Sequence, residues 1–126
     1  MEKPKSLSPA NFEIMKIIWE KKEVTINEVL DVLNEKRKGK LARTSVQVQM
    51  TRLEKYGWLS HRSSGRTFLY YPLHPKEQAV VDIVTDIRDR VFGGSSLEFA
   101  KTLFKDSDIT LESMQEMRDL LEKIKD

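Results

Sequence analysis

Apolar residues return every three or four positions in the first part of the chain, which is the spacing of one face of an α-helix. Ser8 followed by Pro9 is a typical helix start, because serine caps free backbone N–H groups and proline fits the first helical position. We therefore expect a first helix from Ser8 to about Lys22. Its buried face is expected to contain Phe12, Ile14, Met15, Ile18 and Trp19.

A second helix is predicted to begin at Thr25. Thr25 and Glu28 have the spacing of a capping box, in which each side chain accepts a hydrogen bond from the other residue's backbone N–H. The apolar residues that follow, Ile26, Val29, Leu30 and Leu33, fall on one helical stripe. This pattern ends in the basic loop 36–40, whose glycine and consecutive charges cannot continue a buried face.

The third predicted helix, from Arg43 to Tyr56, has two unlike faces. An apolar stripe of Val46, Met50 and Leu53 points to the interior, and Gly57 suits the end of the helix. The opposite face has no acidic residue and consists of Thr44, Gln47, Val48, Thr51, Arg52 and Lys55. Such a face fits a hydrogen-bonding, negatively charged partner. Thr44 and Gln47 also have capping-box spacing, so a structural role is an equal alternative for these two.

The pattern changes to a β-hairpin after the third helix. Residues 58–62 and 66–71 are expected to be strands, because the second run is rich in aromatic and β-branched residues. A turn is predicted at Ser63, Ser64 and Gly65, and Pro72 closes the hairpin. Three helices followed by a hairpin form the order of a winged helix-turn-helix, so we predict a mainly α fold with a small β-hairpin.

The rest of the chain is predicted to be helical. Gly93 and Gly94 interrupt this part, and new helices are expected to start near Ser95 and Thr110. Three short helices cannot bury all their apolar side chains within one chain. We therefore expect a dimerisation domain, 73–126, behind a DNA-binding domain, 1–72. The predicted dimer-interface residues are Val84, Ile87, Val91, Leu103, Met117, Leu121 and Ile124.

Charge supports this division of the chain. The net charge is +2, but residues 1–72 carry 14 lysines and arginines against 8 acidic residues, and residues 73–126 carry 8 against 12. A basic front part favours a polyanionic partner. An acidic rear part favours contacts with protein, because the same polyanion repels it.

Several kinds of chemistry lack the residues that they need. The chain has no cysteine, and His61 and His74 have no carboxylate or second histidine at ligand spacing. A glycine-rich phosphate loop and a nucleophile elbow are also absent from the sequence. No apolar run approaches the roughly 20 residues of a membrane-spanning helix. We expect a cytoplasmic protein without enzymatic activity, metal, cofactor or membrane partner.

In the helix-turn-helix docking mode, the third helix enters the major groove of double-stranded DNA. Its start carries the residues expected to contact bases, which are Thr44, Ser45, Gln47 and Val48. Hydroxyl and cationic side chains around it are expected to contact phosphates, namely Lys36, Lys38, Lys40, Arg43, Thr51, Arg52, Lys55, Arg62 and Arg66. Winged helices also mediate protein contacts, so a protein-interaction module without DNA binding is the alternative.

Motifs in a fixed order connect the chain to a known family. These motifs are Leu7-Ser8 with Glu13, Met15 and Trp19, the run 44–47, the run 52–59, and Gly65-Arg66 with Phe68, Tyr70 and Pro72. Together they resemble the penicillinase repressor family, which includes the β-lactamase and methicillin-resistance repressors and a copper-responsive branch. The resemblance covers residues 7–72 and the helical tail in outline. It implies a homodimeric repressor that binds an inverted-repeat operator and regulates β-lactamase or antibiotic-response genes.

The same resemblance implies a way of releasing the DNA. In the antibiotic-responsive members, a sensor-activated protease cuts the repressor between an asparagine and a phenylalanine in the tail. Alignment places that bond at Thr102 and Leu103, so the pair is not preserved, and release by proteolysis or by a ligand stays open. The copper-responsive branch uses Cys-x-Cys motifs. Copper sensing through thiolates is excluded here because the chain has no cysteine.

Overall fold

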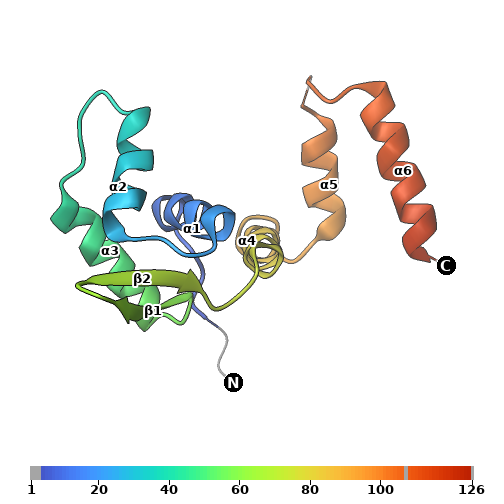
Figure 1. The fold of residues 1–126 in the computed structure, drawn as a ribbon. Coiled ribbons are helices and arrows are strands. Elements are labelled where there is room, and N and C mark those ends of the chain that lie inside the picture. The colour runs from blue at the N-terminus through green and yellow to red at the C-terminus, as the bar shows by residue number, and fades with distance from the viewer. Residues whose placement is uncertain (1–3, 107, 126) are drawn as a thin grey trace. The chain divides into compact units, whose positions relative to one another are not determined.

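The computed structural model describes residues 4–106 and 108–125, and the chain divides into two compact units, 1–83 and 84–126 (Figure 1). The first unit contains α1 (Pro9–Lys21), α2 (Ile26–Glu35), α3 (Arg43–Lys55), β1 (Leu59–Ser64), β2 (Thr67–Pro72) and the start of α4 (Lys76–Val91). The second unit contains the rest of α4, α5 (Ser96–Phe104) and α6 (Leu111–Lys125). The predicted class, mainly α with one small hairpin, is confirmed.

Local caps start the first two helices, as predicted. The Ser8 hydroxyl accepts a hydrogen bond from the Asn11 N–H at 3.1 Å. Thr25 and Glu28 form the complete capping box, with bonds of 3.1 and 3.0 Å between each side chain and the other residue's N–H. The capping alternative for Thr44 and Gln47 is wrong: α3 begins after Ala42, which makes no side-chain cap, and Thr44 lies inside the helix.

The hairpin turn lies one residue later than predicted. Ser64 pairs with Thr67, so Ser63 and Ser64 belong to β1 and the loop consists of Gly65 and Arg66. A two-residue loop that matches the twist of its strands needs a positive φ, and Gly65 supplies it with φ of 63° at the first loop position, as in a type II′ turn. Arg66 therefore lies in the loop at the tip of the wing.

A contact distant in sequence fixes the hairpin to the helices. The Val24 N–H donates to the Tyr70 carbonyl at 3.0 Å, and the Tyr70 N–H donates to the Val24 carbonyl at 2.7 Å. The segment between α1 and α2 is thus joined to β2 by one isolated antiparallel bridge. This bridge was not predicted from the sequence, because Val24 and Tyr70 are far apart in the chain and no local motif indicates that they pair.

One apolar core holds the first unit together. Its completely buried large side chains include Met15 of α1, Met50 and Leu53 of α3, and Trp58, which directly precedes β1. The Trp58 indole N–H donates to the Lys5 carbonyl at 2.5 Å, and the Trp19 indole N–H donates to the His74 carbonyl at 2.8 Å. The two indoles therefore bind the segments before α1 and after β2 to this core.

The second unit buries little of its apolar surface. Its helix starts follow local caps, in which the Ser95 hydroxyl accepts from the Glu98 N–H and the Thr110 hydroxyl accepts from the Ser113 N–H. No residue of α5 is fully buried, although the Phe92 ring contacts the Phe99 ring at 5.2 Å. Among residues 4–106 and 108–125, no helix combines the length and the apolar character that crossing a bilayer requires.

The capping box yields a stability prediction for the first unit. Replacing Thr25 by alanine removes the hydroxyl that accepts the Glu28 N–H, so the free energy of unfolding should fall by about 1 kcal/mol. Urea titration followed by the fluorescence of Trp19 and Trp58 measures it. Thr25→Ser keeps the hydroxyl and is the matched control. Equal losses in both variants would contradict the cap's contribution.

Candidate nucleic-acid interface

The two faces of α3 separate as the sequence predicted. Val46, Met50 and Leu53 are completely buried. The polar side of the helix is exposed along its length, at Thr44, Ser45, Gln47, Val48, Thr51, Arg52 and Lys55. Val48 is 51 % exposed, and it shares a shallow, open hollow with four of these residues. This outer face of α3 has no acidic side chain, because the single acid of the helix, Glu54, is turned to the wing.

Hydrogen bonds connect the first turn of α3 to α2. The Arg43 Nε donates to the Asn27 Oδ1 at 2.9 Å, and the Arg43 Nη1 donates to the Gln47 Oε1 at 3.2 Å. Arg43, predicted to contact phosphate, is thus in contact with two side-chain amides. The Thr51 hydroxyl donates to the Gln47 carbonyl at 2.9 Å, which leaves its oxygen as an acceptor.

The basic loop before α3 is held in place by Asn34. The Asn34 side chain accepts from the Leu41 N–H at 2.8 Å and donates to the Leu41 carbonyl at 3.3 Å. The Lys40 Nζ donates to the Asn34 carbonyl at 2.9 Å, so this lysine lies against the end of α2. The exposed Lys38 lies between these contacts. Hydrogen bonds to Asn34 therefore hold the backbone of the loop at Leu41, while the Lys38 side chain is exposed to solvent.

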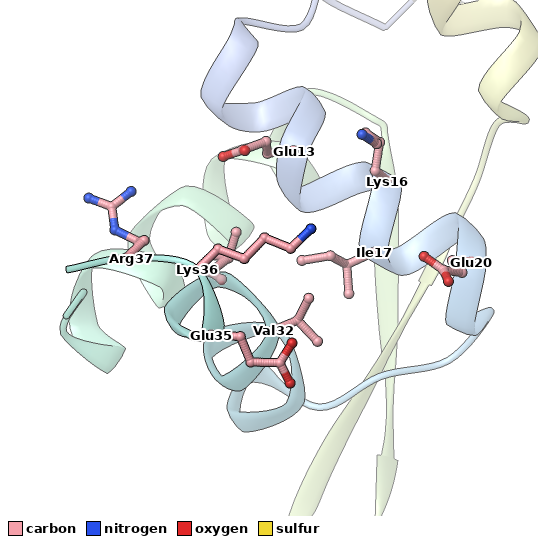
Figure 2. Close-up of a pocket in the computed structure, with 9 residues that line it drawn as sticks. Glu13, Lys16, Ile17, Glu20, Val32, Glu35, Lys36 and Arg37 are labelled. Atoms are coloured by element: carbon pink, nitrogen blue, oxygen red, sulfur yellow. The ribbon is translucent and has the colours of Figure 1, made fainter. Parts of the chain in front are cut away.

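Lys36 lies at a second hollow, of about 400 Å³, between α1 and α2. Figure 2 shows Ile17 and Val32 at its floor, and Lys36 extending over them. Charges of both signs surround this floor, namely Glu13, Lys16, Glu20, Glu35, Lys36 and Arg37. The residues of this hollow are distinct from those of the outer face of α3, so Lys36 is not brought to the hollow that Val48 lines.

The two arginines of the wing have different surroundings. Arg66 lies in the loop and is exposed. Arg62 instead forms a bidentate ion pair with Glu23, in which its Nη2 donates to Oε2 at 2.8 Å and its Nε donates to Oε1 at 3.3 Å. The hydrogen bond from Arg62 lowers the pKa of the Glu23 carboxyl. Sequence reasoning missed this partner, which lies 39 residues away.

A second contact joins the wing to α3. The His61 Nδ1 lies 2.5 Å from the Glu54 Oε1, and the His61 ring packs near the rings of Phe68 and Tyr70, at 4.7 and 5.2 Å. The sequence indicated no carboxylate near His61, because Glu54 lies on another element. Burial raises the pKa of Tyr70, with a smaller effect of the Glu54 charge. The wing and α3 are thus connected by a polar contact beside an aromatic cluster.

This arrangement defines a winged helix-turn-helix protein: three packed helices, an antiparallel wing, and a third helix whose outer face is open and rimmed by cations. A model of the family described as penicillinase repressor matches residues 7–123. The chain belongs to the penicillinase repressor family, as its motifs indicated.

Characterised relatives extend over nearly the whole chain. The penicillinase repressor of Bacillus licheniformis is 26 % identical over 125 residues, which cover 99 % of this chain and 96 % of the relative. The methicillin resistance regulatory protein MecI of Staphylococcus aureus is 22 % identical over 117 residues, with coverage of 93 % and 94 %. The family assignment therefore includes the helical tail.

Two solved repressor structures match about three fifths of the chain. The DNA-binding domain of the repressor BlaI is 33 % identical, with a TM-score of 0.52, covering 60 % of this chain and 90 % of that domain. Monomeric Bacillus licheniformis BlaI in complex with the blaP half-operator is 32 % identical, with a TM-score of 0.51 and coverage of 61 % and 92 %. Escherichia coli MarR, at 16 % identity and a TM-score of 0.53, covers 94 % of this chain and 77 % of its own and supports the fold alone.

The Glu23–Arg62 pair yields a prediction about charge. Glu23→Gln removes the carboxylate and releases Arg62, so binding to a duplex of random sequence should tighten. The slope of log K against log salt should steepen by about one for each new phosphate contact. Glu20→Gln, at an exposed carboxylate of α1, makes the same change in net charge and is the control. An equal effect of both substitutions would show that only net charge matters.

Proposed function

We propose that this protein is a sequence-specific, DNA-binding transcriptional repressor, a regulator and not an enzyme. The observation that carries the proposal is the outer face of α3, which is exposed, free of acidic side chains and opposite a completely buried stripe. Support comes from the BlaI structure solved with the blaP half-operator, whose match covers 61 % of this chain. Repression itself is supported by the names of the relatives.

In this proposal the start of α3 reads bases in the major groove. Thr44, Ser45 and Gln47 offer hydrogen-bonding groups, and the exposed Val48 offers an apolar surface to a thymine methyl group. The flanking cations position the helix on the phosphates and supply affinity that depends on salt. Arg66, at the tip of the wing, reaches the backbone beside the groove.

The proposed repressor acts as a homodimer through its second unit. All seven predicted interface side chains are between 36 and 71 % exposed in the single chain, and Leu121 and Ile124 are the most exposed of those on α6. Covering these apolar groups favours association of two copies, by roughly 25 cal/mol for each Å² removed from water. Two winged helices then bind the two halves of an inverted repeat.

We further propose that the protein acts in the cytoplasm on antibiotic-response genes, and that proteolysis in α5 ends repression. Thr102 is exposed, which supports access, whereas Leu103 is also a predicted interface residue and is exposed in the single chain, so the cut is proposed to follow separation of the two copies. The Thr102 hydroxyl donates to the Glu98 carbonyl at 3.0 Å within the helix. A protease needs an extended substrate, so this helical turn has to open before the bond is cut.

Sequencing of retained DNA tests the proposed function. Random genomic fragments are incubated with the protein, and the bound fraction is recovered and sequenced. A shared inverted repeat is expected. Val48→Glu, which places a carboxylate on the outer face of α3, should abolish enrichment. The matched Val81→Glu, at a similarly exposed valine of α4, should preserve it. Absence of any shared sequence would favour a protein-interaction module.

A prediction for the wing follows from the position of Arg66 in the loop. Arg66→Ala should weaken binding to all duplexes by a similar factor, because phosphate contacts carry no sequence information. The slope of log K against log salt should flatten by about one for each lost contact in each subunit. Titration at several salt concentrations measures both effects. An unchanged slope would mean that the wing tip does not touch the backbone.

A prediction for the second unit concerns its exposed apolar side chains. Leu121→Asp places a charge in the proposed interface, so sedimentation should find monomers and operator binding should weaken sharply, since one half-site supplies only part of the affinity. Gln115→Asp, at an exposed polar position of the same helix, should leave the dimer intact. A dimer that survives Leu121→Asp would place the interface elsewhere.

A further inference from the structure

Three hydrogen-bonded side chains, Asn27 of α2 with Arg43 and Gln47 of α3, form a small corner between the two helices. The Arg43 guanidinium donates through Nε to the Asn27 Oδ1 at 2.9 Å and through Nη1 to the Gln47 Oε1 at 3.2 Å. All three side chains are exposed, and Gln47 also lines the hollow on the outer face of α3. The corner therefore lies on the surface proposed to meet the base edges.

This contact decides which groups Gln47 can offer to a ligand. A glutamine amide carries one oxygen that accepts and one nitrogen with two N–H donors, and the two atoms diverge from the same carbon. The Arg43 guanidinium uses one of the two lone pairs of Oε1 and places a positive charge beside that oxygen, so the N–H donors of Nε2 are the groups left fully available to a partner. Arg43 has five donors of its own and no acceptor. The corner consequently presents donors.

The purine edges in the major groove respond differently to such a surface. Guanine presents two acceptors, N7 and O6, whereas adenine presents the acceptor N7 beside the N6 amino donor. Glutamine usually reads adenine by using its oxygen and its nitrogen together. With one lone pair of Oε1 engaged by Arg43, that pairing is weakened, and the adenine amino group would face the cationic guanidinium.

We propose that the corner makes Gln47 a reader of guanine in preference to adenine, with Arg43 and Asn27 as the residues that position its amide. This inference rests on the proposed function, since it assigns one base of the operator to one side chain. Asn27 lies on α2 and acts only through Arg43. In this arrangement the second helix sets the specificity of the third.

The test begins with the duplex recovered by selection from a randomised library with the wild-type protein. Each base pair of its half-site is then replaced in turn, and binding is titrated for the wild type and for Gln47→Ala. One position should be a guanine at which adenine weakens wild-type binding roughly tenfold. Gln47→Ala should lose most of that discrimination. Gln49→Ala, at a half-buried glutamine of the same helix, should keep it.

The positioning residues are tested at the same base pair by the ratio of guanine to adenine affinity, which a uniform loss of binding does not change. Arg43→Ala frees the Gln47 Oε1, so the ratio should fall to about one or invert. Asn27→Ala should lower it part of the way. Asn27→Asp keeps an acceptor for the Arg43 Nε and should restore it.

Two results would overturn the inference: a base other than guanine at the position coupled to Gln47, or a ratio that Arg43→Ala leaves unchanged. Either result can be obtained only if selection recovers a duplex that the protein binds selectively. If the proposed function itself is wrong, selection yields no shared sequence. Failure of this inference and failure of the proposed function can therefore be told apart.

Discussion

The burial of one stripe of α3 sets the rotation of this helix about its axis. Val46, Met50 and Leu53 have no exposed surface, and they pack into the same core as Trp58 and the apolar side of α1. Turning the helix by one residue, about 100°, would withdraw them and bury polar side chains instead. This constraint decides which residues form the outer face, because the side chains opposite the buried stripe must face the solvent or a ligand.

The wing depends on a second set of contacts, all of them between elements. The isolated Val24–Tyr70 bridge joins β2 to the segment between α1 and α2, and the Glu54–His61 contact joins β1 to α3. The Glu23–Arg62 pair fastens the other side of the wing to the turn between α1 and α2. With the wing held at its base, its two-residue loop carries Arg66 at the tip. These contacts hold the base of the wing, whereas Arg66 lies in its loop and is exposed.

Most of the fold could be predicted from local sequence signals. The features that the sequence did not predict depend on contacts between residues far apart in the chain. The caps at Ser8 and Thr25 and the apolar periods depend on residues a few positions apart, so the sequence predicts them well. The turn was misplaced by one residue, since serine is compatible with a strand or a turn. The partners of Arg43 and Arg62 come from other elements. A list of exposed cations from the sequence therefore cannot tell paired from available charges.

The central claim is that the outer face of α3 lies against the base edges of a duplex. Backbone amide chemical shifts of the isotope-labelled protein, recorded while the selected inverted-repeat duplex is added, test it most directly. The largest changes are expected along residues 43–55 and at the loop of Gly65 and Arg66. Changes confined to α1, to the hollow that Ile17 lines, or to the second unit would contradict the account.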